Sequence, residues 1–471
     1  MGTEIDRVIF AAEEWPKFAK RLKTETAFLR QKFTGGECSR QRPVGGFEIE
    51  AWLTDRTMKP VGVNAEFLDR FNSEMATTEL AKFNFELNNT PQVLHGDAFS
   101  RFFREMKETC SHANRVAEEM RIRVLAIGIL PTAKRGDFCL ENMSETKRYL
   151  ALNEQVLEKR GGKPVELNIK SDDDELKLSH DSVMLESAAT SFQIHTQVPY
   201  DTAHHYYNAS ILVSAATVAL SANSPFLFGK TLWHETRIPL FEQSVDTGEG
   251  LDRVSFGSGF AKENILECFT ENIEDYNILL PILFDGRKET LDHLRFHNGT
   301  IWRWNRPLVG FDKNGTPHFR IEHRVMPSGP TLTDMLANAA FYYGISAILA
   351  KECETGDFAC DFKTARENFY EASRNGLEST VRWYNETLPV HTLIEKKLLP
   401  MAREGLKMLA IDPVDIDRNL AIIEARIANR QNGASWQLQY VGKFGNDMER
   451  LAEAYWEHQQ SGEPVHTWEI T

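Results

Sequence analysis

The chain has 471 residues, of which 42% are hydrophobic and 26% charged, an ordinary globular composition. Its net charge is −14 and it has no run of Lys and Arg, so we expect no nucleic-acid partner. No segment reaches the roughly 20 apolar residues that cross a bilayer, and the start of the chain lacks the order of a secretory signal. We therefore expect a cytoplasmic protein with no membrane partner. Six scattered cysteines without a CxxC pair favour free thiols over disulfides or a zinc site.

The pattern of apolar residues predicts a helix and then a strand-rich region. An amphipathic helix is expected at residues 15–32, and short alternating segments recur from about 44 to 325. Helical stretches lie between them, among them the Ala-rich residues 208–222. The Gly-rich stretch 159–163 and the acidic stretch 171–175 are typical of exposed loops.

The last third of the sequence is helical in pattern. Residues 332–350 are apolar nearly all round, which predicts a buried helix. Three further helices are expected at 362–386, 413–430 and 443–458. We expect one catalytic domain over residues 1–471, with a sheet-based core at about 40–330 and a helical C-terminal part at about 331–471.

Four segments alternate apolar and polar residues with period two, which predicts half-buried strands. They are residues 46–53, 82–88, 191–198 and 317–325. The simplest interpretation is an antiparallel sheet with one face in the core and one in water. However, the polar faces hold Glu, Asn, Gln, His and Arg, and Glu and Asn are depleted in strands. Four such faces side by side favour a functional surface.

Side by side, these strands would gather acidic groups around one histidine. The side chains are Glu48, Glu50, Glu86, His195 and Glu322. Carboxylates held this close either raise their own pKa values or need cations between them, and oxygen-rich clusters suit Mg²⁺. Arg320 and Arg324 flank Glu322 on its face and would add positive charge for phosphate oxygens or a carboxylate. For His195 alone, a hydrogen-bonded histidine at a sheet surface is an equal alternative.

An ordered set of motifs, spanning residues 45–330, resembles glutamate–cysteine ligase family 2. The motifs are GFEIE (46–50), FELNNTPQ (85–92), AIGILPT (126–132), FQIHTQVP (192–199), ANSPFLFG (222–229), WNRP (304–307) and FRIEHR (319–324). The resemblance implies an α+β fold with a glutamine-synthetase-like antiparallel sheet. The concave polar face of that sheet would be catalytic, with helices packed on the other face.

The resemblance also implies roles for individual residues. It implies one metal set made of Glu48, His195 and Glu322, and another made of Glu50 and Glu86. The remaining implied or inferred roles are Glu79 as a further acidic ligand, Arg324 and Arg320 beside the transferred phosphoryl group, Arg237 and Gln193 at the substrate, and Arg303, Arg306 and Trp304 at the nucleotide. Alternatives stay open: a salt bridge for Arg237, exposed side chains for Arg303 and Arg306, and packing for Trp304.

The reaction implied is ATP-dependent. ATP phosphorylates a carboxylate, such as the γ-carboxylate of glutamate, and an amine, such as cysteine, then displaces phosphate. The cofactors would be ATP and two or more Mg²⁺ ions, with Mn²⁺ as an alternative, and no Walker loop or GxGxxG run offers another nucleotide site. Two alternatives remain: the same chemistry on a different acid and amine, or a non-catalytic protein that binds nucleotide and metal. The partners expected are small-molecule acids and amines, and a homo-oligomer stays open.

Overall fold

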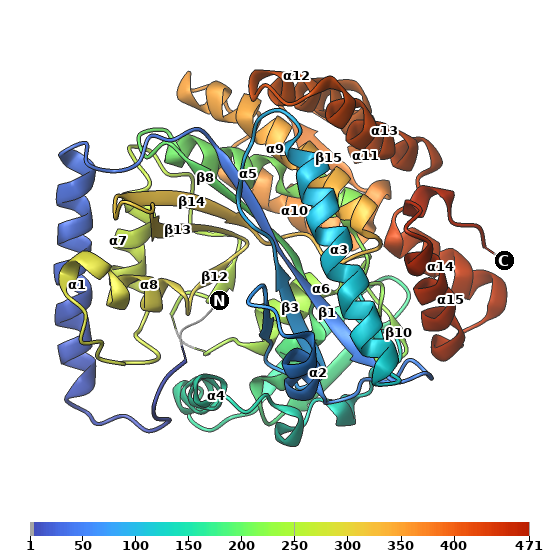
Figure 1. The fold of residues 1–471 in the computed structure, drawn as a ribbon, viewed down its shortest axis with the longest axis horizontal. Helices are drawn as coiled ribbons and strands as arrows, with labels where there is room; N and C mark the ends of the chain where they lie inside the picture. Colours follow the sequence, from blue (N-terminus) through green and yellow to red (C-terminus); the bar gives the residue numbers. More distant parts are fainter. Residues whose placement is uncertain (1–3, 249, 471) are drawn as a thin grey trace.

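The computed structural model describes residues 4–248 and 250–470. An antiparallel sheet runs through its centre in the order β13-β14-β8-β1-β3-β2, with β4 and β5 also paired to β1 (Figure 1). Its strands are β1 Val44–Thr54, β2 Ala76–Thr78, β3 Asn84–Asn88, β4 Gln92–Val93, β5 Arg123–Leu125, β8 Phe192–Val198, β13 Asn305–Phe311 and β14 Pro317–His323. The four strands that the alternation predicts are confirmed as β1, β3, β8 and β14.

The register of the sheet aligns the polar residues of neighbouring strands. Glu50 on β1 lies opposite Glu86 on β3, and Glu322 on β14 lies opposite His195 on β8. Glu48 pairs with Gln193. Because side chains at directly opposed positions leave the sheet on the same face, this register brings the acidic groups of four strands to one surface.

Helices cover the apolar face of the sheet. They are α3 Ala98–Glu119, α5 Ala203–Ser221 and α9 Leu332–Glu354. Phe47 of β1 packs on Phe102 of α3 with ring centroids 5.1 Å apart. His323 of β14 stacks on Tyr342 of α9 at 4.2 Å, and its Nε2 lies 2.9 Å from the Thr217 hydroxyl of α5. The sheet therefore has an apolar face covered by helices and a polar face, as the strand pattern predicts.

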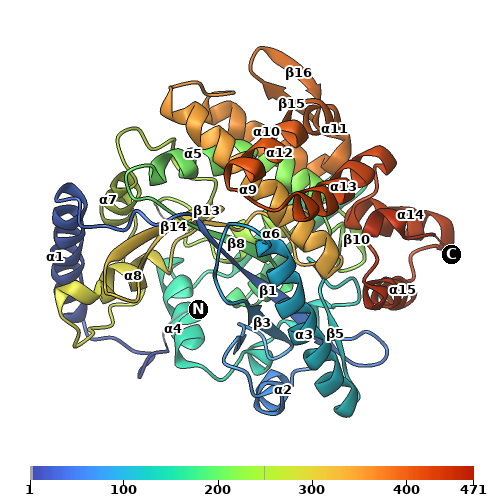
Figure 2. The ribbon, with the colours of Figure 1, turned by 45° about the horizontal axis from the view of Figure 1, so that its top comes forward.

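The N-terminal helix and the last helices lie at opposite edges of the molecule (Figure 1). The predicted helices at 15–32, 208–222, 332–350 and 413–430 are confirmed as α1 Glu14–Thr34, α5, α9 and α13 Pro413–Asn429. From α9 onward the helices gather on one side of the molecule (Figure 2). No helix in the described part of the chain has the length and apolarity that a membrane span requires.

Two predicted helices are wrong in extent, because a glycine interrupts each. The helix expected at 362–386 ends at Asn375 as α10 Phe362–Asn375, before Gly376 at φ +53°, and a hairpin of β15 Thr380–Trp383 and β16 Glu386–Pro389 follows. The helix expected at 443–458 is split at Gly445, φ +86°, into α14 Gly433–Phe444 and α15 Met448–Ser461. Glycine adopts positive φ without steric cost, so it ends a helix readily.

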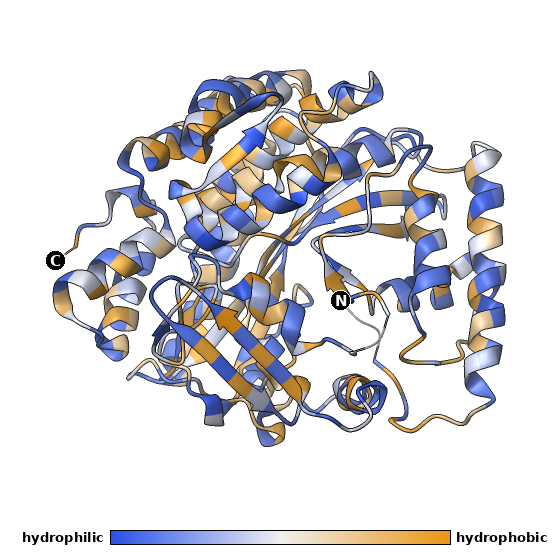
Figure 3. Ribbon diagram, turned by 180° about the vertical axis from the view of Figure 1, so that it is seen from behind, coloured by the Kyte–Doolittle hydropathy of each residue, from blue (hydrophilic) through white to orange (hydrophobic). Residues whose placement is uncertain are grey.

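The remaining elements surround the sheet. The two loops expected at 159–163 and 171–175 flank β6 Val165–Lys170, which pairs with β7 Glu175–His180. Hydrophobic and hydrophilic residues alternate along strands in Figure 3. Apart from other short 3₁₀ and π turns, the other elements are α2 Asn64–Phe71, α4 Lys147–Lys159, the 3₁₀ helix η3 Val183–Ala188, β9 Phe226–Leu227, β10 Lys230–Thr231, α6 Arg237–Ser244, β11 Val254–Ser255, α7 Leu266–Asp275, α8 Asp292–Asn298, β12 Trp302–Arg303, α11 Val390–Leu393 and α12 Leu399–Met408.

Candidate active site

A cavity of about 450 Å³ opens over the polar face of the sheet. We call it the sheet cavity. Strands β1, β3, β8, β13 and β14 form its floor, and α4, α6, α8 and η3 contribute to its walls. Its charged lining includes Glu48, Glu50, Glu79, Glu86, Arg148, Glu186, Arg306, Arg320, Glu322 and Arg324. Most of the polar residues predicted from the four strands therefore share one cavity.

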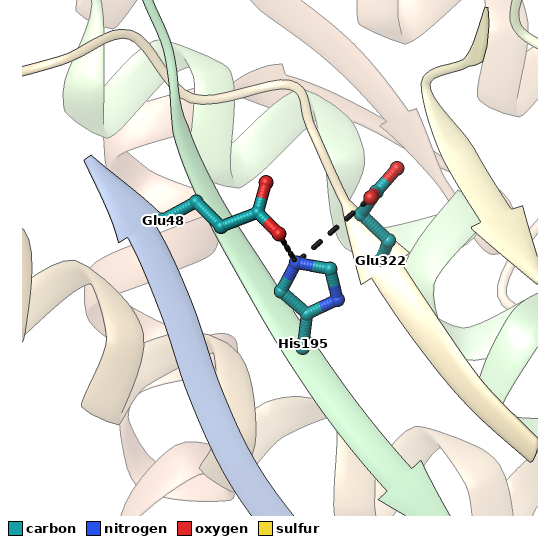
Figure 4. A group of neighbouring side chains, drawn as sticks. All are labelled: Glu48, His195 and Glu322. Atoms are coloured by element: carbon teal, nitrogen blue, oxygen red, sulfur yellow. Dashed lines mark ion pairs between the residues drawn. The ribbon is translucent and has the colours of Figure 1, made fainter. Parts of the chain in front are cut away.

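Glu48, His195 and Glu322 form the first cluster of possible metal ligands, on three neighbouring strands (Figure 4). Nε2 of His195 lies 2.9 Å from Oε1 of Glu48 and 3.8 Å from Oε1 of Glu322. Burial opposes ionisation of Glu48, but His195 outweighs it and lowers the pKa of that carboxyl to about 2. Neither ring nitrogen of His195 makes a hydrogen bond of good geometry among the described residues. A buried imidazole nitrogen between two carboxylates suits a metal ligand.

Two arginines hold Glu322 from the other side. Arg306 of β13 donates from Nε and Nη2 to the two carboxylate oxygens, at 2.7 and 2.9 Å. Arg324 donates from Nη1 to Glu322 at 3.1 Å and to Oε1 of Gln193 at 2.6 Å. Burial disfavours the charged form of Glu322, yet Arg306 and then Arg324 keep its pKa well below the usual range. The carboxylate is thus fixed in its charged form and in its orientation.

Glu50, Glu79 and Glu86 form the second cluster, with ligand atoms within 4.8 Å of one another. Burial and the neighbouring carboxylate of Glu48 raise the pKa of Glu86 to about 8. Burial, with Glu50 and Glu86, raises the pKa of Glu79 well above its ordinary value. Oxygens of three carboxylates this close repel one another, and a divalent cation among them would relieve the repulsion. The donor set, all oxygen, fits Mg²⁺.

Hydrogen bonds orient Glu50 within this cluster. Its carboxylate accepts from the backbone N–H of Ser191 at 2.6 Å, from the Ser191 hydroxyl at 2.8 Å and from Nε2 of Gln193 at 2.9 Å. Gln193 therefore links Glu50 to Arg324, and so joins the two clusters. Both sets fit a divalent ion by ligand chemistry, by proximity and by the partners that hold them in place.

Five charged residues that line the sheet cavity escaped the sequence analysis: Arg148, Glu186, Asp285, Asp292 and Arg295. Glu186 comes from η3, and burial together with Glu50 raises the pKa of its carboxyl to about 8. Arg148 comes from the first turn of α4, and its guanidinium makes no hydrogen bond or ion pair within the described residues. None of the five lies on an alternating strand, so no periodicity marks them. The one local signal is that Glu186 lies shortly before β8, which carries His195.

Arg320 and Arg306 both face the sheet cavity, as expected for groups that contact phosphate oxygens. Nε of Arg320 and Nε of Arg324 are buried and have no hydrogen-bond partner within the described residues. Unsatisfied guanidinium donors beside a cavity can bind anionic oxygens. The contact of these arginines with a phosphoryl group stays a prediction.

Three residues expected at the substrate or nucleotide lie behind the cavity wall. Arg237 is buried, pairs with Glu235 at 3.0 Å and donates to the carbonyls of Arg324 and Val325. Trp304 is fully buried and donates from Nε1 to Glu242 at 2.8 Å. Arg303 pairs with Glu271 at 3.0 Å.

The alternation of β12 explains part of this placement. Trp302 lines the sheet cavity, whereas the next side chain, Arg303, faces away from it and lies over the ring of Tyr276 at 5.5 Å. The geometry favours packing and positioning roles for Arg237, Arg303 and Trp304. Direct contact of any of them with substrate or nucleotide stays a prediction.

Comparisons with known proteins bear on the family and the fold. The family model of glutamate–cysteine ligase family 2 matches residues 45–451. The structure of a glutamate–cysteine ligase from Francisella tularensis in complex with AMP is similar with a TM-score of 0.55 at 10% identity, over 92% of this chain and 91% of that one. A bifunctional glutathione synthetase from Pasteurella multocida gives a TM-score of 0.58 at 10% identity, over 93% of this chain and 55% of that one. Comparison with curated protein sequences finds no match. The fold that the motifs imply is confirmed.

Proposed function

The chain belongs to glutamate–cysteine ligase family 2, and from this premise we propose that it is an ATP-dependent ligase that joins a carboxylate to an amine. The observation that carries the proposal is the pair of carboxylate clusters, Glu48–His195–Glu322 and Glu50–Glu79–Glu86, on one sheet face. Arg306, Arg320 and Arg324 line the same cavity. This combination suits a nucleoside triphosphate bound through metal ions, with arginines around the phosphates.

Phosphoryl transfer asks the protein mainly for positioning and for neutralisation of charge. Glu48, His195 and Glu322 would hold one Mg²⁺ and Glu50, Glu79 and Glu86 another, and the bound ions would neutralise phosphate charge. Arg324 is fixed by Glu322 and Gln193, so its guanidinium is oriented before any substrate binds. It is the residue we assign to the transferring phosphoryl group, with Arg320 beside it. The product of this first step would be an acyl phosphate, which the amine attacks.

We propose the acid and the amine on the basis of the family to which the chain belongs. The γ-carboxylate of glutamate would be the acid and cysteine the amine, and a nucleotide is supported by the AMP complex of the Francisella enzyme. Arg148 offers a free guanidinium in the cavity that could bind a substrate carboxylate. A panel of acids and amines, assayed for phosphate release, separates glutamate and cysteine from other substrates of the same chemistry.

The test of the proposal is the loss of ADP formation when a ligand is removed. We expect Glu48→Ala and Glu322→Ala to lower magnesium-dependent ADP formation by more than about 100-fold, because even indirect partners of a metal contribute 10- to 100-fold. Glu322→Ala leaves two buried arginines without their carboxylate, so folding is checked by circular dichroism and Glu48→Gln serves as the milder variant. Exposed Glu119→Ala is the control and should keep full activity. Magnesium-dependent turnover retained in both alanine variants would refute the assignment.

A further inference from the structure

A second cavity, of about 440 Å³, lies on the opposite side of α6 from the sheet cavity. We call it the α6–α10 cavity, and among the described residues it shares no lining residue with the sheet cavity. Phe241 of α6 faces the sheet cavity, whereas the next residue, Glu242, faces the second one. Its volume lies in the range of small-molecule sites, which start at about 300 Å³.

One wall of the α6–α10 cavity is a row of three side chains on α10. Arg366, Tyr370 and Arg374 follow at steps of four residues, so they lie on one face of the helix about 6 Å apart along its axis. The guanidinium of Arg366 lies 5.8 Å from the ring of Tyr370, and that of Arg374 lies 4.6 Å from the ring of Trp233. Neither arginine forms an ion pair within the described part of the chain, although Arg366 acts electrostatically on the carboxylates of Glu242 and Asp252. Two cations at this wall are therefore available to an anionic group.

Glu242 of α6 also lines this cavity and contacts the middle member of the row, Tyr370. Oε1 of Glu242 accepts two hydrogen bonds, from Nε1 of Trp304 at 2.8 Å and from the hydroxyl of Tyr370 at 2.7 Å. Oε2 accepts no hydrogen bond from the described residues. Burial raises the pKa of this carboxyl to about 7. A carboxylate half satisfied at the edge of a cavity is a strong acceptor for a charged donor.

We propose that the α6–α10 cavity binds a small zwitterion of the amino-acid or short-peptide class. The ammonium group of this ligand contacts Oε2 of Glu242, and its carboxylate contacts Arg366 or Arg374 of α10. Trp233, Phe256 and Tyr276 supply apolar surface for the rest of the ligand. The cavity lining carries both signs of charge, from the carboxylates of Glu242, Asp252 and Glu271 and the guanidinium groups of Arg366 and Arg374, which favours a ligand with both signs.

Ligand binding here has a physical route to the sheet cavity. Trp304, held by Glu242, lies 5.3 Å from the guanidinium of Arg237. Arg237 donates to the backbone carbonyl of Arg324, the residue assigned to the phosphoryl group. A ligand on Glu242 therefore acts two side chains away from Arg324. This effect on turnover rests on the proposed function, whereas the binding itself does not.

The experiment is a calorimetric titration of the full-length protein with a panel of free α-amino acids. The strongest binder is then compared with its N-acetyl derivative, which lacks the ammonium charge, and its amide, which lacks the carboxylate. We expect both derivatives to bind at least about tenfold more weakly, because each loses a charge-assisted hydrogen bond. The same loss is expected in Glu242→Gln, whose side chain still accepts from Trp304 and Tyr370, and in Arg366→Glu combined with Arg374→Glu.

Two controls separate this cavity from the sheet cavity and from general charge effects. Lys363→Glu, an exposed charge reversal on the same helix, should bind as the unmodified protein does. Arg324→Ala should lose ADP formation and still bind the ligand. Loss of binding in Arg324→Ala, equal affinity in Glu242→Gln, or no binding of any amino acid would overturn the proposal. An inactive protein that binds the ligand through Glu242 would refute the proposed function alone.

Discussion

Arg303 and Arg306 are three residues apart, and each is paired to a carboxylate, but they belong to different surroundings. Arg306 pairs with Glu322 at the floor of the sheet cavity. Arg303 pairs with Glu271 and lies against Tyr276, outside that cavity. Strand geometry, in which side chains alternate between faces, sets this difference.

This contrast predicts different results for the two alanine variants. Arg306→Ala should lower ADP formation by about 10- to 100-fold, because it releases a ligand residue from its bidentate partner. Arg303→Ala should lower the free energy of unfolding by about 3 kcal/mol, because it leaves a partly buried carboxylate unpaired, and should leave turnover per folded molecule unchanged. Steady-state ADP formation and urea denaturation measure the two effects. Equal loss of turnover in both variants would contradict the roles assigned here.

A second residue-level prediction concerns pH. His297 is buried, its Nε2 lies 2.7 Å from the carbonyl of Asn272, and burial lowers its pKa from 6.5 to about 4. The unfolded chain therefore binds this proton first, so the contribution of His297 to stability is complete above pH 6.5 and is lost as the pH falls toward 4. The loss is on the order of 3 kcal/mol.

The check is the free energy of unfolding measured from pH 7 to pH 4.5. His297→Gln should show a shallower decrease than the unmodified protein, whereas His95→Gln, at an exposed position, should show the same decrease. Parallel pH dependences for all three proteins would exclude His297 as a source of acid sensitivity.

At the scale of the elements, the strands could be predicted better than their arrangement. Period two alone places Glu48, Glu50 and Trp52 on one face, so the acidic face was predictable. The register that sets Glu50 opposite Glu86 depends on long-range pairing, which no local pattern encodes. Arg148 was not predictable for another reason, since it lies in a helix whose role depends on where that helix docks.

The two predicted helices that glycines interrupt show the same limit of prediction from local sequence patterns. An amphipathic pattern can continue across a glycine, and only the backbone conformation reveals that the helix stops there. At Gly376 a Cβ atom would meet the ring of His234 at 2.6 Å, so a tertiary contact as well as the positive φ favours glycine at that position. The sequence thus predicts the element types well, and their ends and partners less well.

Helix α9 ties two site strands together through one hydroxyl, which gives an element-level prediction. The Tyr343 hydroxyl accepts from the N–H of Gly46 at 3.1 Å and lies 3.0 and 3.1 Å from the carbonyls of Gly46 and His195. Tyr343→Phe should lower the free energy of unfolding by about 1–3 kcal/mol, since a buried N–H loses its acceptor. Tyr342→Phe should cost less, because Ser210 keeps a second partner, the carbonyl of Tyr206. Urea denaturation of both variants provides the comparison, and an equal or reversed order would contradict this role of Tyr343.

At the scale of the whole molecule, the helical C-terminal part is joined to the sheet-based core by buried polar groups as well as apolar packing. Asn432 donates from Nδ2 to the carbonyl of Ala219 at 2.8 Å, and Gln437 donates to Oδ1 of Asn223 at 3.0 Å. Asn223 in turn donates to the hydroxyl of Tyr455 at 2.7 Å. These bonds join α14 and α15 to the end of α5. Separating the two parts would leave each of these groups without its partner in an apolar region.

We therefore expect residues 4–470 to unfold as one cooperative unit. Far-UV circular dichroism and tryptophan fluorescence should report the same single transition in urea. Arg426 probes the connection, because its buried guanidinium bonds Asp334, Asn338 and the carbonyl of Leu220. Arg426→Met should leave Asp334 unpaired and shift the whole transition to lower urea, with an unchanged slope, because the exposed surface is the same. Two separate transitions, with only one of them shifted by Arg426→Met, would show instead that the core and the helical part are independent domains.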